Sequence, residues 1–150
     1  MQRIITLACC LIALSCSGQQ TIQEKLGYPK NAKLVIIHAD DLGVAHSENA
    51  ASTNAMEKGS VNSASIMVPT PWFPEIANYA ATHPDADLGL HITLTSEWKY
   101  LKWGPVTPDH LVPGLVNKQG FLFSSVDSVR RSATAAEVEE ETRNQVKRAI

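Results

Sequence analysis

Three short apolar segments in the first two thirds of the chain predict β-strands. The run Leu34-Val35-Ile36-Ile37 is continuous and rich in β-branched residues, which is typical of a strand buried on both faces of a parallel sheet. Residues 61–68 and 87–94 are also dominated by apolar positions, and Pro69 ends the first of these two segments. The pattern therefore predicts three strands, each followed by a more polar segment.

Segments between and after these strands predict three helices. We expect the first helix over 47–58, with Ser47 as its N-cap and Gly59 as its stop. The second is expected over 72–82 and the third over 134–150. Alternating strands and helices predict an α/β fold, with a parallel sheet and helices on its outside. In such folds the loops at the carboxyl ends of the strands carry the chemistry.

The last predicted helix opens with a capping box formed by Thr134 and Glu137. Glu139 and Arg143 lie one turn apart and are expected to pair on its surface, and the acidic run 137–141 is expected to be solvated. Its apolar face is predicted to contain Val138, Thr142, Val146 and Ile150. The stretch before it, 95–131, is rich in Pro and Gly and predicts a long loop that covers an active site.

The composition is that of a globular protein with a substantial core. Of 150 residues, 44% are hydrophobic and 19% are charged, which excludes a disordered or fibrous chain. The 13 basic and 15 acidic residues give a formal net charge of −2, so the chain lacks the excess of positive charge that binding to nucleic acid requires. We therefore expect a single domain and no nucleic-acid partner.

The first residues have the pattern of an export signal. Arg3 is the one charged residue among the first fifteen, and the apolar run from Ile4 to Leu14 is too short to span a membrane. The residues Ala13-Leu14-Ser15-Cys16 resemble a bacterial lipoprotein cleavage site. We therefore predict a signal peptide over 1–15, lipidation of the cysteine at its end, and a polar tether over 16–33.

Such a lipid anchor would place the protein in the cell envelope, on the periplasmic or outer-membrane side. An ordinary secreted protein and a cytosolic protein with an apolar N-terminus are the alternatives. The three cysteines are Cys9, Cys10 and Cys16, so a mature chain that starts at Cys16 has neither a disulfide nor a thiolate zinc site. We expect the core alone to hold the fold together.

Two adjacent carboxylates follow the first predicted strand. Asp40 and Asp41 repel each other unless a cation or a proton offsets their charge, and a divalent metal is the simplest compensator. One could bind the metal while the other takes a proton; a helix-capping Asp beside a solvated neighbour is the alternative. His91 lies near the end of the third strand, where it either joins the two aspartates at one edge of the sheet or is a hydrogen-bonded core histidine.

Other histidines and aromatic residues indicate a functional site less strongly than Asp40, Asp41 and His91 do. His38 precedes the two aspartates and either supports their site or packs at the end of the strand. His46 either caps a helix, contacts substrate or is an exposed loop residue. Trp98, Tyr100 and Trp103 form a cluster that either stacks on a sugar ring or makes a small core that holds the long loop.

Four segments carry a resemblance to a known family. They are His38-Ala39-Asp40-Asp41-Leu42-Gly43, His46-Ser47 with Asn49-Ala50, Ser63-Ala64-Ser65-Ile66-Met67, and Gly89-Leu90-His91-Ile92-Thr93-Leu94. In this order and spacing they resemble the YdjC-like carbohydrate deacetylase family, and the resemblance covers roughly residues 34–150. The Asp-Asp and Gly-Leu-His motifs together make it specific.

The resemblance implies a partial (β/α) barrel, related to TIM barrels and polysaccharide deacetylases, and metal-dependent removal of acetyl groups from N-acetylated sugars or oligosaccharides. It implies that Asp41 and His91 bind one divalent metal ion and that Asp40 is the general base for the water that attacks the acetyl carbonyl. The mixed ligands suit zinc and an oxygen-rich water shell suits magnesium, so the metal stays open. His46, Trp98 and Trp103 are the candidate substrate contacts.

The chain departs from the family pattern in its length. Family members carry a further metal-binding histidine on the strand that would follow the last helix, and an eight-stranded barrel takes about 250 residues. We therefore expect residues 34–150 to be the N-terminal portion of a truncated deacetylase domain. A catalytically inactive metal- or glycan-binding envelope lipoprotein is the alternative function, and a homodimer is one assembly that the sequence leaves open.

Overall fold

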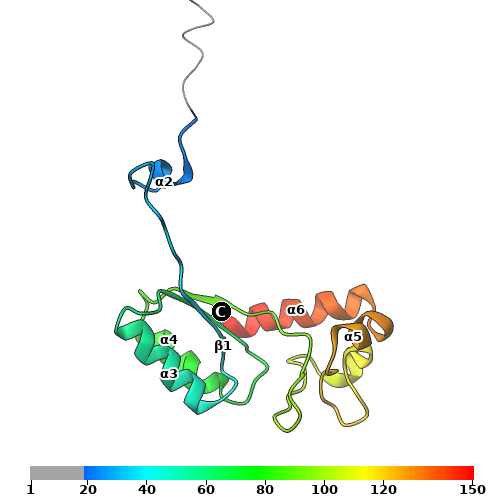
Figure 1. Cartoon of the computed structure of the whole chain (residues 1–150). Helices are drawn as coiled ribbons and strands as arrows, with labels where there is room; N and C mark the ends of the chain where they lie inside the picture. Colours follow the sequence, from blue (N-terminus) through cyan, green and yellow to red (C-terminus); the bar gives the residue numbers. More distant parts are fainter. Residues whose placement is uncertain (1–18) are drawn as a thin grey trace, which may run out of the picture. The chain divides into compact units, whose positions relative to one another are not determined.

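The structure is a computed structural model that describes residues 19–150 (Figure 1). The chain divides into two compact units, one up to Val35 and one from Ile36 onward. In the first unit the chain forms one helical turn, α2 (Ile22–Lys25), which a capping box begins. The second unit contains the sheet and every residue predicted to carry chemistry after the tether.

Part of the predicted N-terminal organisation falls outside the described residues. This applies to the signal peptide over 1–15 and to Cys16, and the tether over 16–33 is described only from Gln19 onward. Within 19–150, none of the helices combines the length and the apolar character that crossing a membrane requires.

A parallel three-stranded sheet organises the second unit. Its strands are β1 (His38–Leu42), β2 (Ser63–Ile66) and β3 (Leu88–Leu90), and they lie in the spatial order β1-β2-β3. Ala64 on the central strand pairs with Ala39 on one side and with Leu88 on the other. The predicted α/β class with a parallel sheet is confirmed, and the strands that the structure describes form an open sheet.

The first strand begins later than the sequence predicts. The run from Leu34 to Ile37 precedes β1, and its four side chains are between 42% and 77% exposed instead of buried. The prediction was wrong because a strand is buried on both faces only where other elements cover both sides, and within residues 19–150 these side chains stay exposed. Ile37 begins the pairing with the β2 side, since its N–H donates to Asn62 Oδ1 (2.8 Å) and its C=O accepts from Asn62 N–H (3.0 Å).

Two helices follow the first two strands, α3 (His46–Glu57) and α4 (Phe73–Thr82). They contact each other, and Figure 1 shows them side by side along the sheet. The buried side chains of this layer come from the strands and from α4: Leu42, Ala64, Ile66 and Ile76. Burial of this apolar layer is the main stabilising contribution on this side of the sheet.

The start of α3 differs by a residue or two from the prediction. Its N-cap is Ala45, so Ser47 lies within the first turn and does not cap the helix. The tight turn after β1, closed by Val44 N–H donating to the Asp41 C=O (3.3 Å), lets the helix begin earlier. The predicted stop at Gly59 is confirmed, because this glycine has the left-handed φ of +74° that ends helices.

The segment over 95–131 is packed and contains structure, whereas the sequence predicted a long loop. It contains two 3₁₀ turns, η1 (Asp109–Leu111) and η2 (Pro113–Leu115), and the helix α5 (Val126–Ser132). A second core holds these elements together and comprises Val44, Met67, Trp103, Val112, Leu115, Leu122 and Val129. Apolar side chains at irregular spacing produce this core, which periodicity does not detect.

The last helix, α6 (Ala135–Ala149), starts at the predicted capping box. Thr134 Oγ1 accepts from Glu137 N–H, and Glu139 pairs with Arg143 (2.6 Å) as expected. Only part of the predicted apolar face is buried, where Val138 packs against the second core. Glu141 and Gln145 are fully buried, while Val146 and Ile150 are exposed.

Candidate metal and catalytic site

A bulge at the carboxyl end of β1 sets the direction of the two adjacent aspartates. The pairing of β1 with β2 shifts register between Ala39 and Leu42, and Asp41 has a φ of +61°. A left-handed backbone is uncommon in residues other than glycine, although Asp is one of those that tolerate it. Bulges commonly redirect side chains beside functional sites. Because of the bulge, the direction of the Asp41 side chain does not have to follow the regular alternation of side chains along the strand.

The structure brings Asp41 and His91 together at this edge of the sheet. Asp41 Oδ1 lies 3.2 Å from His91 Nδ1. The backbone fixes His91, because its N–H donates to the C=O of Ile66 (2.9 Å) and extends the pairing of β3 with β2. The two side-chain atoms are close but not aligned as a hydrogen bond, so the buried Nδ1 has no hydrogen-bond partner.

The surroundings of Asp41 disfavour its negative charge. Burial raises the pKa of the Asp41 carboxyl above its ordinary value, and the neighbouring charges of Asp40 and Glu97 raise it further, while His91 acts in the opposite direction. A cation between Asp41 and His91 would offset these like charges and give Nδ1 its missing partner. Two donor atoms that share one cation at about 2.1 Å are about 3 Å apart, close to the observed separation.

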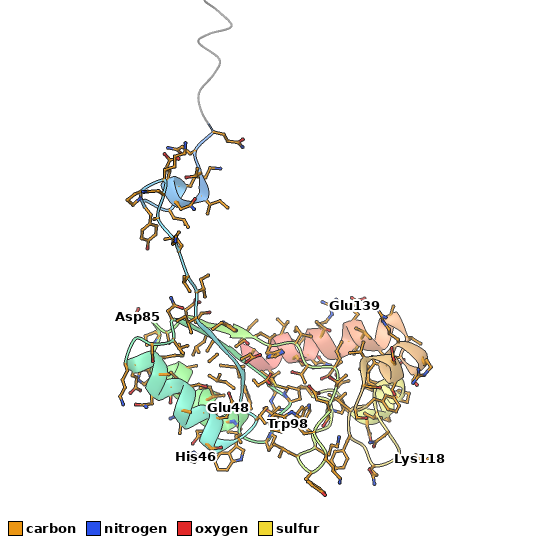
Figure 2. All side chains as sticks on the ribbon, in the orientation of Figure 1. His46, Glu48, Asp85, Trp98, Lys118 and Glu139 are labelled. Atoms are coloured by element: carbon orange, nitrogen blue, oxygen red, sulfur yellow. The ribbon has the colours of Figure 1, made fainter. Side chains whose placement is uncertain are left out.

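Glu48 adds a fourth carboxyl group to this region, beside those of Asp40, Asp41 and Glu97. It lies in the first turn of α3 (Figure 2), and burial raises its pKa to about 7, with further contributions from the charges of Asp41 and Asp40. Its Oε1 accepts a long hydrogen bond from Ser52 Oγ (3.5 Å), whereas Oε2 is buried without a hydrogen-bond partner. This end of the sheet therefore concentrates negative charge that no described hydrogen bond neutralises.

The sheet face opposite α3 and α4 is polar. Because side chains alternate along a strand, the serines of β2 point away from the face on which Ala64 and Ile66 are buried. On that polar face His38 Nδ1 lies 2.9 Å from Ser63 Oγ, and Nε2 lies 3.0 Å from Ser65 Oγ. His38 is therefore an exposed residue whose ring is held by β2, and it is not packed in the core at the strand end.

Asn49 ties the loop after β1 to the loop after β2. This buried side chain accepts a hydrogen bond from Gly43 N–H (2.7 Å) and donates to the C=O of Trp72 (3.2 Å) and to Glu75 Oε2 (2.7 Å). The backbone adds a direct link, since Trp72 N–H donates to the Gly43 C=O (2.8 Å). Gly43 is two residues after Asp41, so these bonds fix the backbone of Trp72 against the loop that follows Asp41.

His46 and Trp72 form a rim beside the loop that carries Asp41. Their ring centroids are 5.3 Å apart at an interplanar angle of 41°, and Trp72 is 44% exposed. His46 Nδ1 lies 2.6 Å from Glu75 Oε1, and hydrogen bonds from Asn49 and His46 lower the pKa of Glu75. Because His46 follows β1 and Trp72 follows β2, both lie at the carboxyl edge of the parallel sheet.

The two tryptophans of the predicted sugar-stacking cluster have different environments. Trp98 is 43% exposed and presents its indole at the surface (Figure 2), whereas Trp103 is 4% exposed and belongs to the second core. Trp103 Nε1 donates to the C=O of Thr95 (3.0 Å), and the two rings meet edge-on at 6.3 Å. The expected substrate contact by Trp103 was wrong, because its ring is used to hold the segment after β3.

Glu48, Trp72 and Glu75 were not predicted from the sequence as residues of this site. Trp72 and Glu75 follow the carboxyl end of β2, so the strand-end argument that found Asp41 would have found them too. Glu48 carried no comparable signal, because an acidic residue in the first turn of a helix is usually there to complement the helix dipole.

The amino-acid sequence of the chain matches a known protein family. Residues 34–150 match the model of the family described as YdjC-like protein. The chain belongs to the YdjC-like family. This confirms the resemblance carried by the Asp-Asp and Gly-Leu-His motifs.

Two curated relatives of this YdjC-like chain are named carbohydrate deacetylase. The one from Thermus thermophilus is 32% identical over 126 residues, which cover 84% of this chain and 42% of the relative. The one from Brevibacillus brevis is 32% identical over 116 residues, covering 77% of this chain and 43% of the relative. The chain thus spans less than half the length of the curated relatives it matches.

A solved structure with a similar fold comes from Enterococcus faecalis, and it is described as a cellobiose-phosphate cleavage protein. It superimposes with a TM-score of 0.66 at 26% sequence identity, over 76% of this chain and 42% of that one. The similarity in fold therefore extends over most of this chain.

Proposed function

We propose that this YdjC-like chain carries part of the catalytic site of a metal-dependent hydrolase that removes acetyl groups from N-acetylated sugars or oligosaccharides. The observation that carries the proposal is the approach of Asp41 Oδ1 to the unpartnered His91 Nδ1, at the carboxyl edge of a parallel sheet. Curated relatives named carbohydrate deacetylase support the choice of substrate class.

The pair of donor atoms fits a divalent cation. A carboxylate oxygen with an imidazole nitrogen suits zinc, and water molecules at the remaining positions would suit magnesium. Within residues 19–150 no group of three or more His, Cys, Asp or Glu side chains is placed to hold an ion, so Asp41 and His91 supply two protein ligands. Catalytic zinc sites typically have three, so we expect these two residues alone to bind a cation weakly.

In the proposed reaction a bound cation would polarise the acetyl carbonyl and make an attacking water more acidic. Asp40 accepts the proton from that water, because it adjoins Asp41 on β1 and its carboxylate is exposed. The water oxygen bonds to the carbonyl carbon, the C–N bond breaks, and the nitrogen leaves as an amine after it takes up a proton. Acetate and an amino sugar are the products.

Exposed rings at the same edge are the proposed contacts for the sugar. His46, Trp72 and Trp98 follow β1, β2 and β3 respectively, and each presents an exposed ring. Sugar rings have flat apolar faces that pack on aromatic side chains. Three such rings around one edge suit a substrate with more than one sugar unit.

We also propose that the sheet corresponds to part of a (β/α) barrel. The helices α3 and α4 lie on one face, while the opposite face carries His38, Ser63 and Ser65 and is polar. In a barrel the helices are outside, so this polar face would line the interior. The matched residues cover less than half of each relative, which leaves room for the remaining strands.

Acetate release tests the proposal. The protein expressed from its native gene is incubated with N-acetylated chitooligosaccharides, with EDTA, and with EDTA followed by added Zn²⁺ or Mg²⁺. We expect acetate release that EDTA abolishes and one of the metals restores. His91→Ala should remove it, whereas His110→Ala, a change at an exposed histidine in η1, should not. Near-normal turnover in His91→Ala would contradict the assignment.

A further inference from the structure

The side chain of Gln145 forms two hydrogen bonds with the backbone just beyond β3. Its Oε1 accepts from Thr93 N–H (2.9 Å), and its Nε2 donates to the Thr93 C=O (2.6 Å). The amide of Gln145 thus pairs with both backbone groups of one residue, as a neighbouring strand would. Gln145 is fully buried and Thr93 nearly so, so these backbone groups depend on Gln145 in place of water.

Glu141 holds Gln145 in place. Gln145 Nε2 also donates to Glu141 Oε1 (2.7 Å), one turn earlier on α6. The carboxylate of Glu141 further accepts from the N–H groups of Val106 and Thr107, both at 2.9 Å. A fully buried carboxylate with three donors has little freedom to move, which fixes the side-chain conformation of its neighbour as well.

Thr93 connects this arrangement to His91. Thr93 Oγ1 donates to the C=O of His91 (2.9 Å), and on the other side His91 N–H donates to Ile66 (2.9 Å). β3 itself ends at Leu90, so regular pairing does not fix the chain after His91. Beyond the end of β3, the side-chain amide of Gln145 supplies the backbone hydrogen bonds that a neighbouring strand would otherwise supply.

We propose that Gln145 is a positioning residue for His91: it clamps the backbone of Thr93 and thereby keeps His91 Nδ1 directed at Asp41. This rests on the proposed function, in which His91 and Asp41 share a cation. Supporting groups commonly set ligand orientation, and loosening them weakens metal binding about 10- to 100-fold. The hydrogen bonds of Gln145 go to Thr93 and Glu141 and not to His91, so its effect on His91 would pass through the backbone.

The test compares two neighbouring variants of the full chain. Gln145→Met keeps the length of the side chain and removes both bonds to Thr93. Asn144→Ala is the matched control on the same helix, because Asn144 Nδ2 donates to Thr107 Oγ1 (2.9 Å) and does not bond Thr93. The thermal midpoint and the affinity for Mn²⁺ are measured for each variant. Without metal, the NMR signals of the His91 ring and the hydrogen exchange at Thr93 N–H are measured as well.

We expect both variants to lower the thermal midpoint, but only Gln145→Met to weaken Mn²⁺ binding, by tenfold or more. Without metal, only Gln145→Met should shift the His91 ring signals and speed exchange at Thr93. Equal loss of Mn²⁺ affinity in both variants would show a general effect on stability and overturn the proposal. Unchanged His91 signals in Gln145→Met would also overturn it.

The test can still be decided if Gln145→Met does not fold or if the wild-type chain binds no Mn²⁺. If Gln145→Met does not fold, Thr93→Val removes the bond to the His91 C=O while it keeps the shape of the side chain, and it should also shift the His91 signals. If the wild-type chain binds no Mn²⁺, the proposed cation site fails. The positioning role is then decided by the His91 ring signals alone.

Discussion

Four carboxyl groups surround one end of the sheet, those of Asp40, Asp41, Glu48 and Glu97, and the ring of His91 lies against one of them. At the residue scale, burial raises the pKa values of Asp41 and Glu48, and the neighbouring like charges raise them further. A protein keeps such an arrangement only where a cation or a proton offsets the charge. The proposed division of roles between these groups can be tested one residue at a time.

Asp40→Asn should show whether Asp40 acts as the general base or as a metal ligand. The amide cannot take a proton from water, so we expect acetate release to fall about 10²- to 10⁴-fold. Cation affinity should stay close to that of the wild type, because Asp41 and His91 are unchanged. Asp85→Asn, in the turn before β3, is the matched control, and it should change neither quantity. Loss of cation binding in Asp40→Asn would instead make Asp40 a ligand.

Glu48→Gln should stabilise the protein at neutral and alkaline pH. The pKa of Glu48 is raised from an ordinary 4.5 to about 7, so between these values the folded protein holds a proton that the unfolded chain has lost. The free energy of unfolding therefore falls as pH rises from about 4.5 to 7. Since Glu48 is partly exposed, we expect this penalty to be on the order of 1 kcal/mol.

Thermal unfolding at pH 5 and pH 8 measures this penalty. The midpoint of Glu48→Gln should match that of the wild type at pH 5 and exceed it at pH 8. Added divalent cation should narrow the difference at pH 8, because it offsets the charge of Glu48 in the wild type. A variant that is less stable than the wild type at pH 8 would show that the carboxylate makes a stabilising interaction.

At the element scale, the turn from β1 into α3 depends on Gly43. It has a φ of +102°, and a Cβ placed on it would lie 2.7 Å from Thr70 Oγ1 and 3.0 Å from the Met67 C=O. Gly43→Ala should therefore destabilise the protein by about 2 kcal/mol or more, through backbone strain and steric overlap. It should also displace Asp41 and weaken cation binding.

Gly59→Ala is the control for this substitution. Gly59 has a similar left-handed φ of +74°, but nothing lies within 4 Å of the position of its Cβ. We expect a cost of about 1 kcal/mol from the backbone alone and no effect on cation binding. Denaturant unfolding of the two variants gives both values. Equal costs would mean that the close approach of Thr70 to Gly43 is relieved by small movements.

Two helix boundaries could be predicted from the sequence, whereas the start of α3, the helix α5 and the buried face of α6 could not. The capping box at Thr134 and the stop at Gly59 are local signals, and both were correct. The predicted apolar face of α6 was wrong in part, because Glu141 and Gln145 are buried and accept hydrogen bonds from backbone N–H groups that lie 34 to 52 residues away in the sequence. Hydrophobic periodicity carries no information on such long-range hydrogen bonds.

Part of the candidate site could also be predicted from the sequence, because the order of the strands and helices already places some of its residues. Asp41 and His91 meet because the carboxyl ends of parallel strands share one edge, which the order of elements already implies. The same argument extends to Trp72, which follows β2, whereas Glu48 reaches this edge from the first turn of α3, where an acidic residue usually complements the helix dipole. Trp103 was misassigned because an exposed and a buried tryptophan look alike in the sequence.

At the scale of the whole molecule, we propose that the protein is exported and anchored to the cell envelope through Cys16. The motif Ala13-Leu14-Ser15-Cys16 and the polar residues after it support this proposal. Labelled palmitate should be incorporated into the wild-type protein and not into Cys16→Ser. Cys10→Ser, inside the predicted signal peptide, is the control and should still be labelled. Recovery of a soluble protein whose mature N-terminus lies beyond Cys16 would contradict the anchor.

The central claim is that Asp41 and His91 converge on one divalent-cation site. Paramagnetic broadening of amide NMR signals by Mn²⁺ tests it most directly, because the method locates weak sites and needs no substrate. We expect broadening centred on residues 40–43 and 90–92, which Asp41→Asn or His91→Gln removes. Broadening that is centred on the acidic run of α6, or that persists unchanged in both variants, would contradict the claim.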